Sequence, residues 1–181
     1  MKVLGIVAGP RRNGHTAKLV EAVLRGAKEA GHDTDIFYLG DMDINPIGAG
    51  EDCYIYPEDD MALLYPHLES MGALVLGTPI YYDHVSSRCK LFIDRLHYYS
   101  RTHGEEYRRR FPDAVRCVNI ITYGWDRADP YDHVLEWMNG RMRGYWGMEV
   151  AGNLKAQGTG LRIQEHDPTL IERAEEIGRS L

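Results

Sequence analysis

Five short apolar runs alternate with segments of helical periodicity, and this alternation constrains the fold more than any other feature of the sequence. The runs, rich in Val, Ile and Leu, span residues 3–8, 34–39, 73–77, 114–121 and 148–156. The helical segments span residues 16–30, 59–70, 86–97, 131–145 and 168–181. Apolar strands joined by helices are typical of a parallel sheet covered on both faces, because each crossover helix lies over the sheet. We therefore predict a doubly wound α/β fold with five parallel strands in the order 2-1-3-4-5, and a ligand crevice where strands one and three end.

The length and composition bound the functions that this chain can have. We expect one domain over residues 1–181, because a chain of 181 residues can bury a core of ordinary size. A formal net charge of -6 argues against nucleic acid as a partner, since phosphate-backbone binders need a clustered excess of Lys and Arg. No run reaches the roughly 20 apolar residues that a membrane helix needs, and the N-terminus does not resemble a signal peptide. We expect a cytoplasmic protein that does not bind membranes.

The three cysteines, Cys53, Cys89 and Cys117, are far apart in the sequence. Their number is odd and C-x-x-C spacing is absent, so the sequence predicts neither a disulfide framework nor a metal site. This cysteine usage fits a reducing compartment.

A glycine loop lies between the first strand and the first helix, at residues 9–16 (GPRRNGHT). Gly9 and Gly14 allow the backbone to curl until several N–H groups point inward, and the helix that follows presents its positive N-terminus to the same place. This arrangement predicts a phosphate cradle. The alternative is a strand-to-helix turn that binds nothing.

The side chains of this loop suit one terminal phosphate better than a triphosphate. His15 stands where the nucleoside-triphosphatase loop requires lysine, so the fixed cation for β- and γ-phosphates is missing. Arg11 offers a planar fork of donors, Thr16 a hydroxyl and His15 a ring N–H.

Two further loops at predicted strand ends carry aromatic residues. Residues 77–86 (GTPIYYDHVS) combine a proline, which fixes the backbone beside a planar ring, with two tyrosines that offer stacking faces. Residues 122–126 (TYGWD) again join glycine with aromatic side chains. A phosphate cradle beside two such loops predicts a mononucleotide with a flat ring, a description that FMN meets. Alternatively, Tyr81 and Tyr82 only cover the sheet end and Trp125 lies on the surface; on either interpretation Ser86 is expected to cap the next helix.

Residues 9–16 resemble the S-P-R-x-x-G-N-T loop of the NADPH-dependent FMN reductase and iron-sulfur flavoprotein group, within the flavodoxin-like superfamily. Residues 77–95 (GTPIYYDHVSSRCKLFIDR) resemble the group's G-S-P-x-Y-x-x-x-V-S-x-x-x-K-x-F-I-D-R stretch even more closely. Asp59-Asp60-Met61 also recurs in the group, and the similarity spans roughly residues 2–125.

The resemblance implies a flavodoxin-like domain that binds FMN and uses NAD(P)H to reduce a quinone, free flavin or another small acceptor. The flavin carries the difficult chemistry in such enzymes, so we nominate no catalytic side chain and no metal ligand. The predicted cofactor-binding residues, from the loop arguments and the resemblance together, are Gly9, Arg11, Gly14, His15, Thr16, Pro79, Ile80, Tyr81, Tyr82, Thr122, Tyr123 and Gly124. The resemblance also implies a homo-oligomer, a dimer or a tetramer, for which residues 98–112 are the candidate interface.

The sequence departs from the group at two places. Gly9 and His15 replace the usual Ser and Asn, which alters two side-chain contacts to phosphate. Residues 45–53 retain only Cys53 where iron-sulfur flavoproteins carry a compact run of cysteines, and a [4Fe–4S] cluster needs four thiolates, so we predict no cluster. Two alternatives stay open: an electron carrier like flavodoxin without its own substrate, and a phosphate-binding module that has lost flavin.

Overall fold

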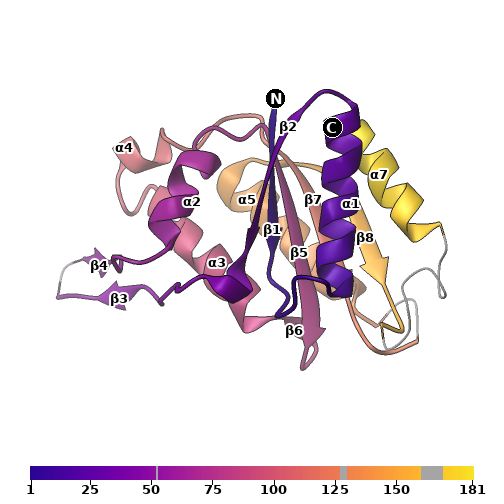
Figure 1. Ribbon diagram of the computed structural model, residues 1–181. Coiled ribbons are helices and arrows are strands. Elements are labelled where there is room, and N and C mark those ends of the chain that lie inside the picture. The colour runs from indigo at the N-terminus through magenta and orange to yellow at the C-terminus, as the bar shows by residue number, and fades with distance from the viewer. Residues whose placement is uncertain (52, 127–129, 160–168) are drawn as a thin grey trace.

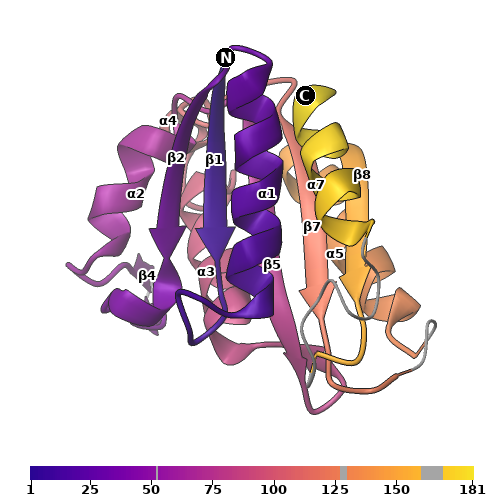
Figure 2. The same cartoon turned by 45° about the vertical axis from the view of Figure 1, so that its right-hand side comes forward.

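The computed structural model describes residues 1–51, 53–126, 130–159 and 169–181. Its centre is a parallel sheet of five strands: β1 (Lys2–Val7), β2 (Asp33–Tyr38), β5 (Ala73–Tyr81), β7 (Arg116–Thr122) and β8 (Glu149–Ala156). These strands lie in the order β2-β1-β5-β7-β8 and all pair in parallel (Figure 2). The predicted doubly wound α/β fold and the strand order 2-1-3-4-5 are therefore confirmed.

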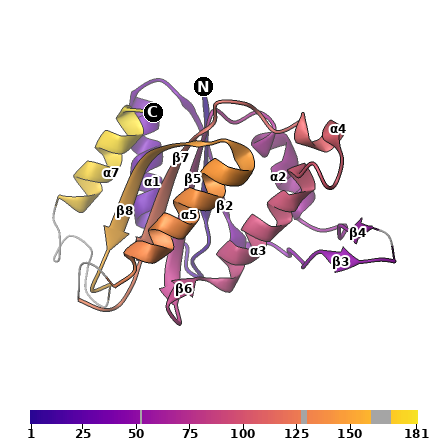
Figure 3. The same cartoon turned by 180° about the vertical axis from the view of Figure 1, so that it is seen from behind.

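Helices cover both faces of this sheet. The helices α1 (His15–Glu29) and α7 (Leu170–Arg179) lie on one face, whereas α3 (Ser87–Arg95) and α5 (Asp132–Trp146) lie on the other (Figures 1 and 3). The short helix α2 (Met61–Leu68) packs on the same side as α3, where its buried side chains join the core. Two separate apolar clusters result, one on each face of the sheet, because alternate strand residues point to opposite faces.

Strand β5 is longer than the sequence predicted. The predicted strand ended at Gly77, yet β5 continues to Tyr81, because Thr78 and Pro79 still pair with β7 and Ile80 begins a short antiparallel ladder with β6 (His84–Val85). Strand β7 in turn begins at Arg116, two residues later than predicted, since Ala114 has a positive φ of 57° that does not belong to a strand.

Close packing at two glycines holds α1 in position against the sheet and against α7. A Cβ atom added at Gly77 would lie 2.6 Å from Cγ2 of Val20, so α1 packs against β5 only because no side chain stands there. At Gly26 an added Cβ would meet the backbone oxygen of Glu175 at 1.9 Å, which shows how tightly α7 crosses α1. The start of α1 is thereby held over the carboxyl ends of β1 and β5.

The long connection from residue 40 to residue 57 forms an arm that extends from the body (Figure 1). After the 3-10 turn η1 (Leu39–Asp41), it contains a small hairpin of β3 (Gly48–Ala49) and β4 (Tyr54–Ile55). Tyr54 and Ile55 are about half exposed there.

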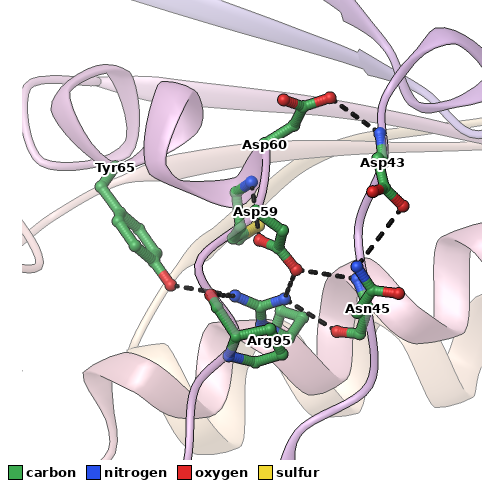
Figure 4. A network of polar contacts seen from close by, with 8 residues as sticks. Asp43, Asn45, Asp59, Asp60, Tyr65 and Arg95 are labelled. Carbon is green, nitrogen blue, oxygen red and sulfur yellow. Dashed lines mark hydrogen bonds and ion pairs between the residues drawn. The ribbon is translucent and has the colours of Figure 1, made fainter.

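A buried ion pair between Arg95 and Asp59 holds the base of this arm (Figure 4). Both side chains are only 1% exposed, and Nη1 of Arg95 also donates to the carbonyl of Asn45 at 2.8 Å. Burial alone would raise the pKa of Asp59, but the guanidinium and the backbone N–H groups of Asn45 and Met61 bind the carboxylate and lower its pKa.

The candidate interface at residues 98–112 is mostly exposed or half-buried, and only two of its side chains, Tyr99 and Phe111, belong to the core. It includes part of the 3-10 helix η2 (Leu96–Tyr99) and the short helix α4 (Glu105–Arg108). Tyr99 and Phe111 are buried in the core of this chain, so their side chains face inward and are not available to a partner. The expectation of an oligomer through this segment rests on its remaining, more exposed residues.

Candidate functional site

A pocket opens at the carboxyl edge of the sheet, where β1, β5, β7 and β8 end. Its lining comes from four connections far apart in the sequence: Gly9, Pro10, Arg11, Gly14, His15, Thr16, Pro79, Ile80, Tyr81, Thr122, Tyr123, Gly124 and Thr159. The strands deliver these segments to one place because parallel strands end at the same edge of a sheet. In Figure 2 this is the lower edge, below the start of α1.

Eleven of the twelve residues predicted from the sequence line this pocket. The structure does not bring Tyr82 into it: the side chain is fully exposed, in a turn where Tyr82 and Asp83 have φ values of 47° and 65°. That left-handed turn directs Tyr82 outward between β5 and β6. Its predicted contact with a cofactor stays a prediction.

Two pocket residues were not among those predicted: Pro10, which lies within the predicted glycine loop, and Thr159, which lies outside every predicted loop. Thr159 follows β8, and its N–H donates to the carbonyl of Tyr123 at 3.1 Å, which ties the end of the fifth strand to the end of the fourth. The sequence could have indicated Thr159, because the fifth predicted strand must also end at the carboxyl edge of the sheet. Gly158 and Thr159 follow that strand.

The backbone at the start of α1 forms the predicted cradle. Gly14 is the N-cap residue and provides no side-chain hydrogen bond, and no acidic residue lies in the first turn. The N–H of Gly14 donates to the carbonyl of Arg11 at 3.2 Å and closes the turn, while a Cβ at Gly14 would crowd that oxygen at 3.2 Å. The first N–H groups of a helix have no intrahelical partner, so this end of α1 suits an anion.

Hydrogen bonds of side-chain hydroxyl groups connect the strand ends around the cradle. The buried hydroxyls of Thr16 and Thr122 lie 2.8 Å apart, joining α1 to β7. Ser86 Oγ donates to the carbonyl of Ala8 at 3.0 Å, and the Ser86 N–H donates to Thr78 Oγ1 at 3.1 Å, joining α3, β1 and β5. Ser86 also accepts from the N–H of Cys89, which confirms the predicted helix cap. The pocket walls are thus held in place by direct bonds.

The two arginines of the loop have different surroundings. Arg12 pairs with Asp41 at 2.6 Å, and its guanidinium lies 4.5 Å from the centre of the Tyr38 ring. Arg11 lines the pocket and makes no ion pair with any carboxylate of the described residues. Arg11 is therefore the arginine free to bind an anion in the pocket.

His15 stands at the first position of α1 with a buried, unbonded ring nitrogen. Its Nδ1 is shielded from solvent and has no hydrogen-bond partner within the described part of the chain. Burial lowers the pKa of His15, and the positive charges of Lys18 and Arg11 lower it further.

An aromatic rim consists of Tyr81, Tyr123, Tyr131 and Trp125, of which Tyr81 and Tyr123 line the pocket itself. Tyr123 is buried and its ring lies 4.9 Å from that of Tyr131, whose hydroxyl donates to Asp83 at 3.0 Å. Tyr81 and Trp125 remain 49% and 58% exposed, so this rim is open to a planar molecule from solution.

The cysteines do not lie together. Cys53 is exposed at the arm, whereas Cys89 and Cys117 are buried in the core, where burial raises the pKa of Cys89 to about 12 and of Cys117 to about 11. In the ranges that the structure describes, no group of three His, Cys, Asp or Glu side chains is arranged to hold a metal ion. None of the described helices is long and apolar enough to cross a membrane.

The residues present fit the phosphate and ring of FMN. The uncapped helix start, the free guanidinium of Arg11 and the unpartnered Nδ1 of His15 match an anion that carries several acceptor oxygens. The doubly wound sheet with this pocket at its switch point defines the flavodoxin-like class of proteins.

Comparisons with known proteins narrow this class to a family. The model of the NADPH-dependent FMN reductase family matches residues 1–122, and the chain belongs to this family. The resemblance stated from the sequence is thereby confirmed.

Relatives of known name agree with this assignment. An iron-sulfur flavoprotein of Archaeoglobus fulgidus is 31% identical over 100 residues, which cover 53% of this chain and 46% of that protein. YwqN of Bacillus subtilis, a putative NAD(P)H-dependent FMN-containing oxidoreductase, is 27% identical over 161 residues, covering 80% of this chain and 83% of that protein. The matched region spans about half the length of the iron-sulfur flavoproteins.

Solved structures share the fold over nearly the whole chain. A flavone reductase superposes with a TM-score of 0.74 at 22% identity, covering 99% of this chain and 61% of that one. The NAD(P)H:quinone oxidoreductase from Methanothermobacter marburgensis has a TM-score of 0.72 at 19% identity, with 99% and 96% covered.

Proposed function

We propose that this protein binds FMN in the pocket at the carboxyl edge of the sheet and uses NAD(P)H to reduce a small acceptor such as a quinone or free flavin. The observation that carries the proposal is the meeting of the uncapped helix start and the aromatic rim in one pocket, in a member of the FMN reductase family. Bound FMN supplies the two-electron chemistry in such enzymes.

The cradle residues would hold the phosphate. Arg11 donates through its planar guanidinium, and the first N–H groups of α1 donate from the backbone. Thr16 adds a hydroxyl whose direction is set by Thr122. A hydroxyl has one hydrogen and two acceptor positions, so when Thr122 donates across the 2.8 Å contact, the hydrogen of Thr16 is free to point at the phosphate.

The ends of β5 and β7 would hold the ring. Pro79, Ile80 and Tyr81 line one side of the pocket, while Tyr123 and Gly124 line another. The pairing of Pro79 with Thr122 across the two strands keeps these segments at a fixed separation. Backbone groups held in this way can bind the edge of a planar heterocycle without rearranging, which lowers the entropic cost of binding.

The exposed aromatic rim favours a planar acceptor. Tyr81 and Trp125 are each about half exposed beside the pocket, and stacking on such rings favours flat conjugated molecules over aliphatic ones. Quinones and flavins share this shape. The loop of residues 77–86 contains one histidine, His84, whose ring packs edge-on against Trp137 with ring centres 4.7 Å apart, and we assign no side chain to proton transfer.

The first experiment is the visible spectrum of the purified protein, before and after addition of FMN and then of NADPH without oxygen. The proposal predicts a flavin spectrum that bleaches with NADPH and recovers when a quinone is added. A protein that stays colourless and ignores FMN would refute it. Bound flavin that is reduced only slowly, with no faster NADPH oxidation on adding quinones, would select the electron-carrier alternative.

Two neighbouring variants make the binding test specific. Arg11→Ala removes a charge-assisted contact, which is worth about 1.5–3 kcal/mol, so FMN affinity should fall roughly 10- to 100-fold. Arg12→Ala is the matched control, because its guanidinium is bound to Asp41. Riboflavin, which lacks the phosphate, should bind both variants and the wild type equally.

A further inference from the structure

The orphaned nitrogen of His15 distinguishes this cradle from an ordinary helix start. A buried polar atom without a partner is uncommon in folded proteins, and here it belongs to a pocket residue beside Arg11 and the uncapped end of α1. Among the described residues, no group forms a hydrogen bond with this nitrogen. An anion in the cradle would supply the missing partner.

Within the described part of the chain, the charges that act on His15 disfavour its protonation while the cradle holds no anion. Lys18 lies one turn further along α1 and Arg11 lies in the preceding loop, and both act on the ring electrostatically. Among the groups of the described residues, the backbone of Thr159, after β8, acts in the opposite direction. As far as the structure describes them, the ends of β5 and β7 contribute no carboxylate, lysine, arginine or histidine to the pocket lining.

Resting on the proposed function, we propose that His15 is a proton-dependent contact for the FMN phosphate, so that its protonated form binds the cofactor more tightly than its neutral form. The phosphate would neutralise the local excess of positive charge and accept a hydrogen bond from the imidazolium. In the neutral ring only one nitrogen carries a hydrogen, whereas in the cation both do.

The sign of the linkage follows from this arrangement. Without an anion, burial, Lys18 and Arg11 lower the pKa of His15, whereas a bound phosphate dianion raises it. A group that takes up a proton on binding strengthens binding as pH falls. A charge-assisted hydrogen bond is about twice as strong as a neutral one, so protonation of His15 should raise the affinity for FMN by a factor of roughly ten.

The phosphate titrates in the same range, so the experiment must remove its contribution. The second pKa of a phosphate monoester is about 6, and protonation of the dianion weakens binding as pH falls. Both effects act in the wild type, but only the effect of the phosphate remains in His15→Asn. The ratio of the two FMN dissociation constants, variant over wild type, isolates the contribution of His15.

We would measure FMN dissociation constants by quenching of flavin fluorescence between about pH 5.5 and 8 for the full-length wild type, His15→Asn and His32→Asn. His32 precedes β2 at the opposite edge of the sheet and serves as the matched control. The ratio for His15→Asn should rise about tenfold from pH 8 to pH 5.5, and the ratio for His32→Asn should stay constant. Riboflavin should show no change in ratio for either variant.

An NMR titration of the wild type provides a second readout, which does not depend on how tightly any variant binds FMN. The ring signal of His15, assigned by its absence in His15→Asn or His15→Gln, should titrate at higher pH in the presence of FMN and be unmoved by riboflavin. A constant ratio together with an unshifted His15 titration, in a protein that does bind FMN, would overturn the inference and leave the proposed function intact. Failure of the wild type to bind FMN at any pH would refute both.

Discussion

Replacing Arg95 by methionine should destabilise the protein severely, because it leaves a buried carboxylate without its cation. Asp59 and Arg95 are each 1% exposed, and Asp59 would keep only the N–H groups of Asn45 and Met61 as partners. Breaking a buried ion pair from one side costs about 3–5 kcal/mol. That loss is a large share of the roughly 5–15 kcal/mol by which folded domains are stable. The base of the arm would be affected first.

The dependence on pH tests this reasoning directly. In the wild type the pKa of Asp59 lies below its ordinary value, so the stabilisation is present at neutral pH and is lost as pH falls through that lowered pKa. In Arg95→Met, burial remains while the guanidinium is gone, so the carboxyl pKa rises and protonation relieves the cost. Urea unfolding at about pH 7 and pH 4.5 should therefore show a deficit for Arg95→Met that shrinks at the lower pH.

A second ion pair on the same helix provides the control. Lys90 and Asp94 lie on α3 with 2.6 Å between their charged atoms, but both side chains are 49% exposed. Lys90→Met should cost less than about 0.5 kcal/mol, since exposed pairs contribute little. If Arg95→Met costs no more than Lys90→Met at pH 7, or if its deficit is the same at both pH values, the argument from the buried pair is wrong.

Four further substitutions test how the pocket walls are held. Thr16→Val or Thr122→Val alone should lower the free energy of unfolding by about 1–3 kcal/mol, because each leaves the other buried hydroxyl unpaired. The double variant should be nearly as stable as the wild type, and a double-mutant cycle in which the two single costs add would contradict this. Gly77→Ala should lose about 1–3 kcal/mol in urea unfolding, because its Cβ would lie 2.6 Å from Val20, and an unchanged midpoint would show that α1 can shift. Ser86→Ala should lower stability by about 0.5–2 kcal/mol, and thermal melts that match the wild type would show that its cap is dispensable.

Much of the fold could be predicted because it depends on local patterns. The apolar runs and the helical periodicities between them specify strand–helix alternation, and a parallel sheet follows from crossover geometry. The loop residues of the site then meet without any further information, since parallel strands end at one edge. The boundaries were less accurate: β5 extends to Tyr81 through pairing with β6 and β7, and such pairing is not encoded in the run itself.

The sequence by itself determined three of the four loops that form the pocket, because their order along the chain fixes which strand ends they follow; the fourth, at Thr159, was found in the structure. Only the tertiary structure decided what each side chain does there. Arg11 and Arg12 are adjacent and chemically identical, yet Arg12 is bound to Asp41 and only Arg11 lines the pocket. Tyr81 and Tyr82 are likewise adjacent, but the left-handed turn directs Tyr82 into solvent. Such differences arise from partners distant in sequence and from backbone direction, which a one-dimensional pattern does not contain.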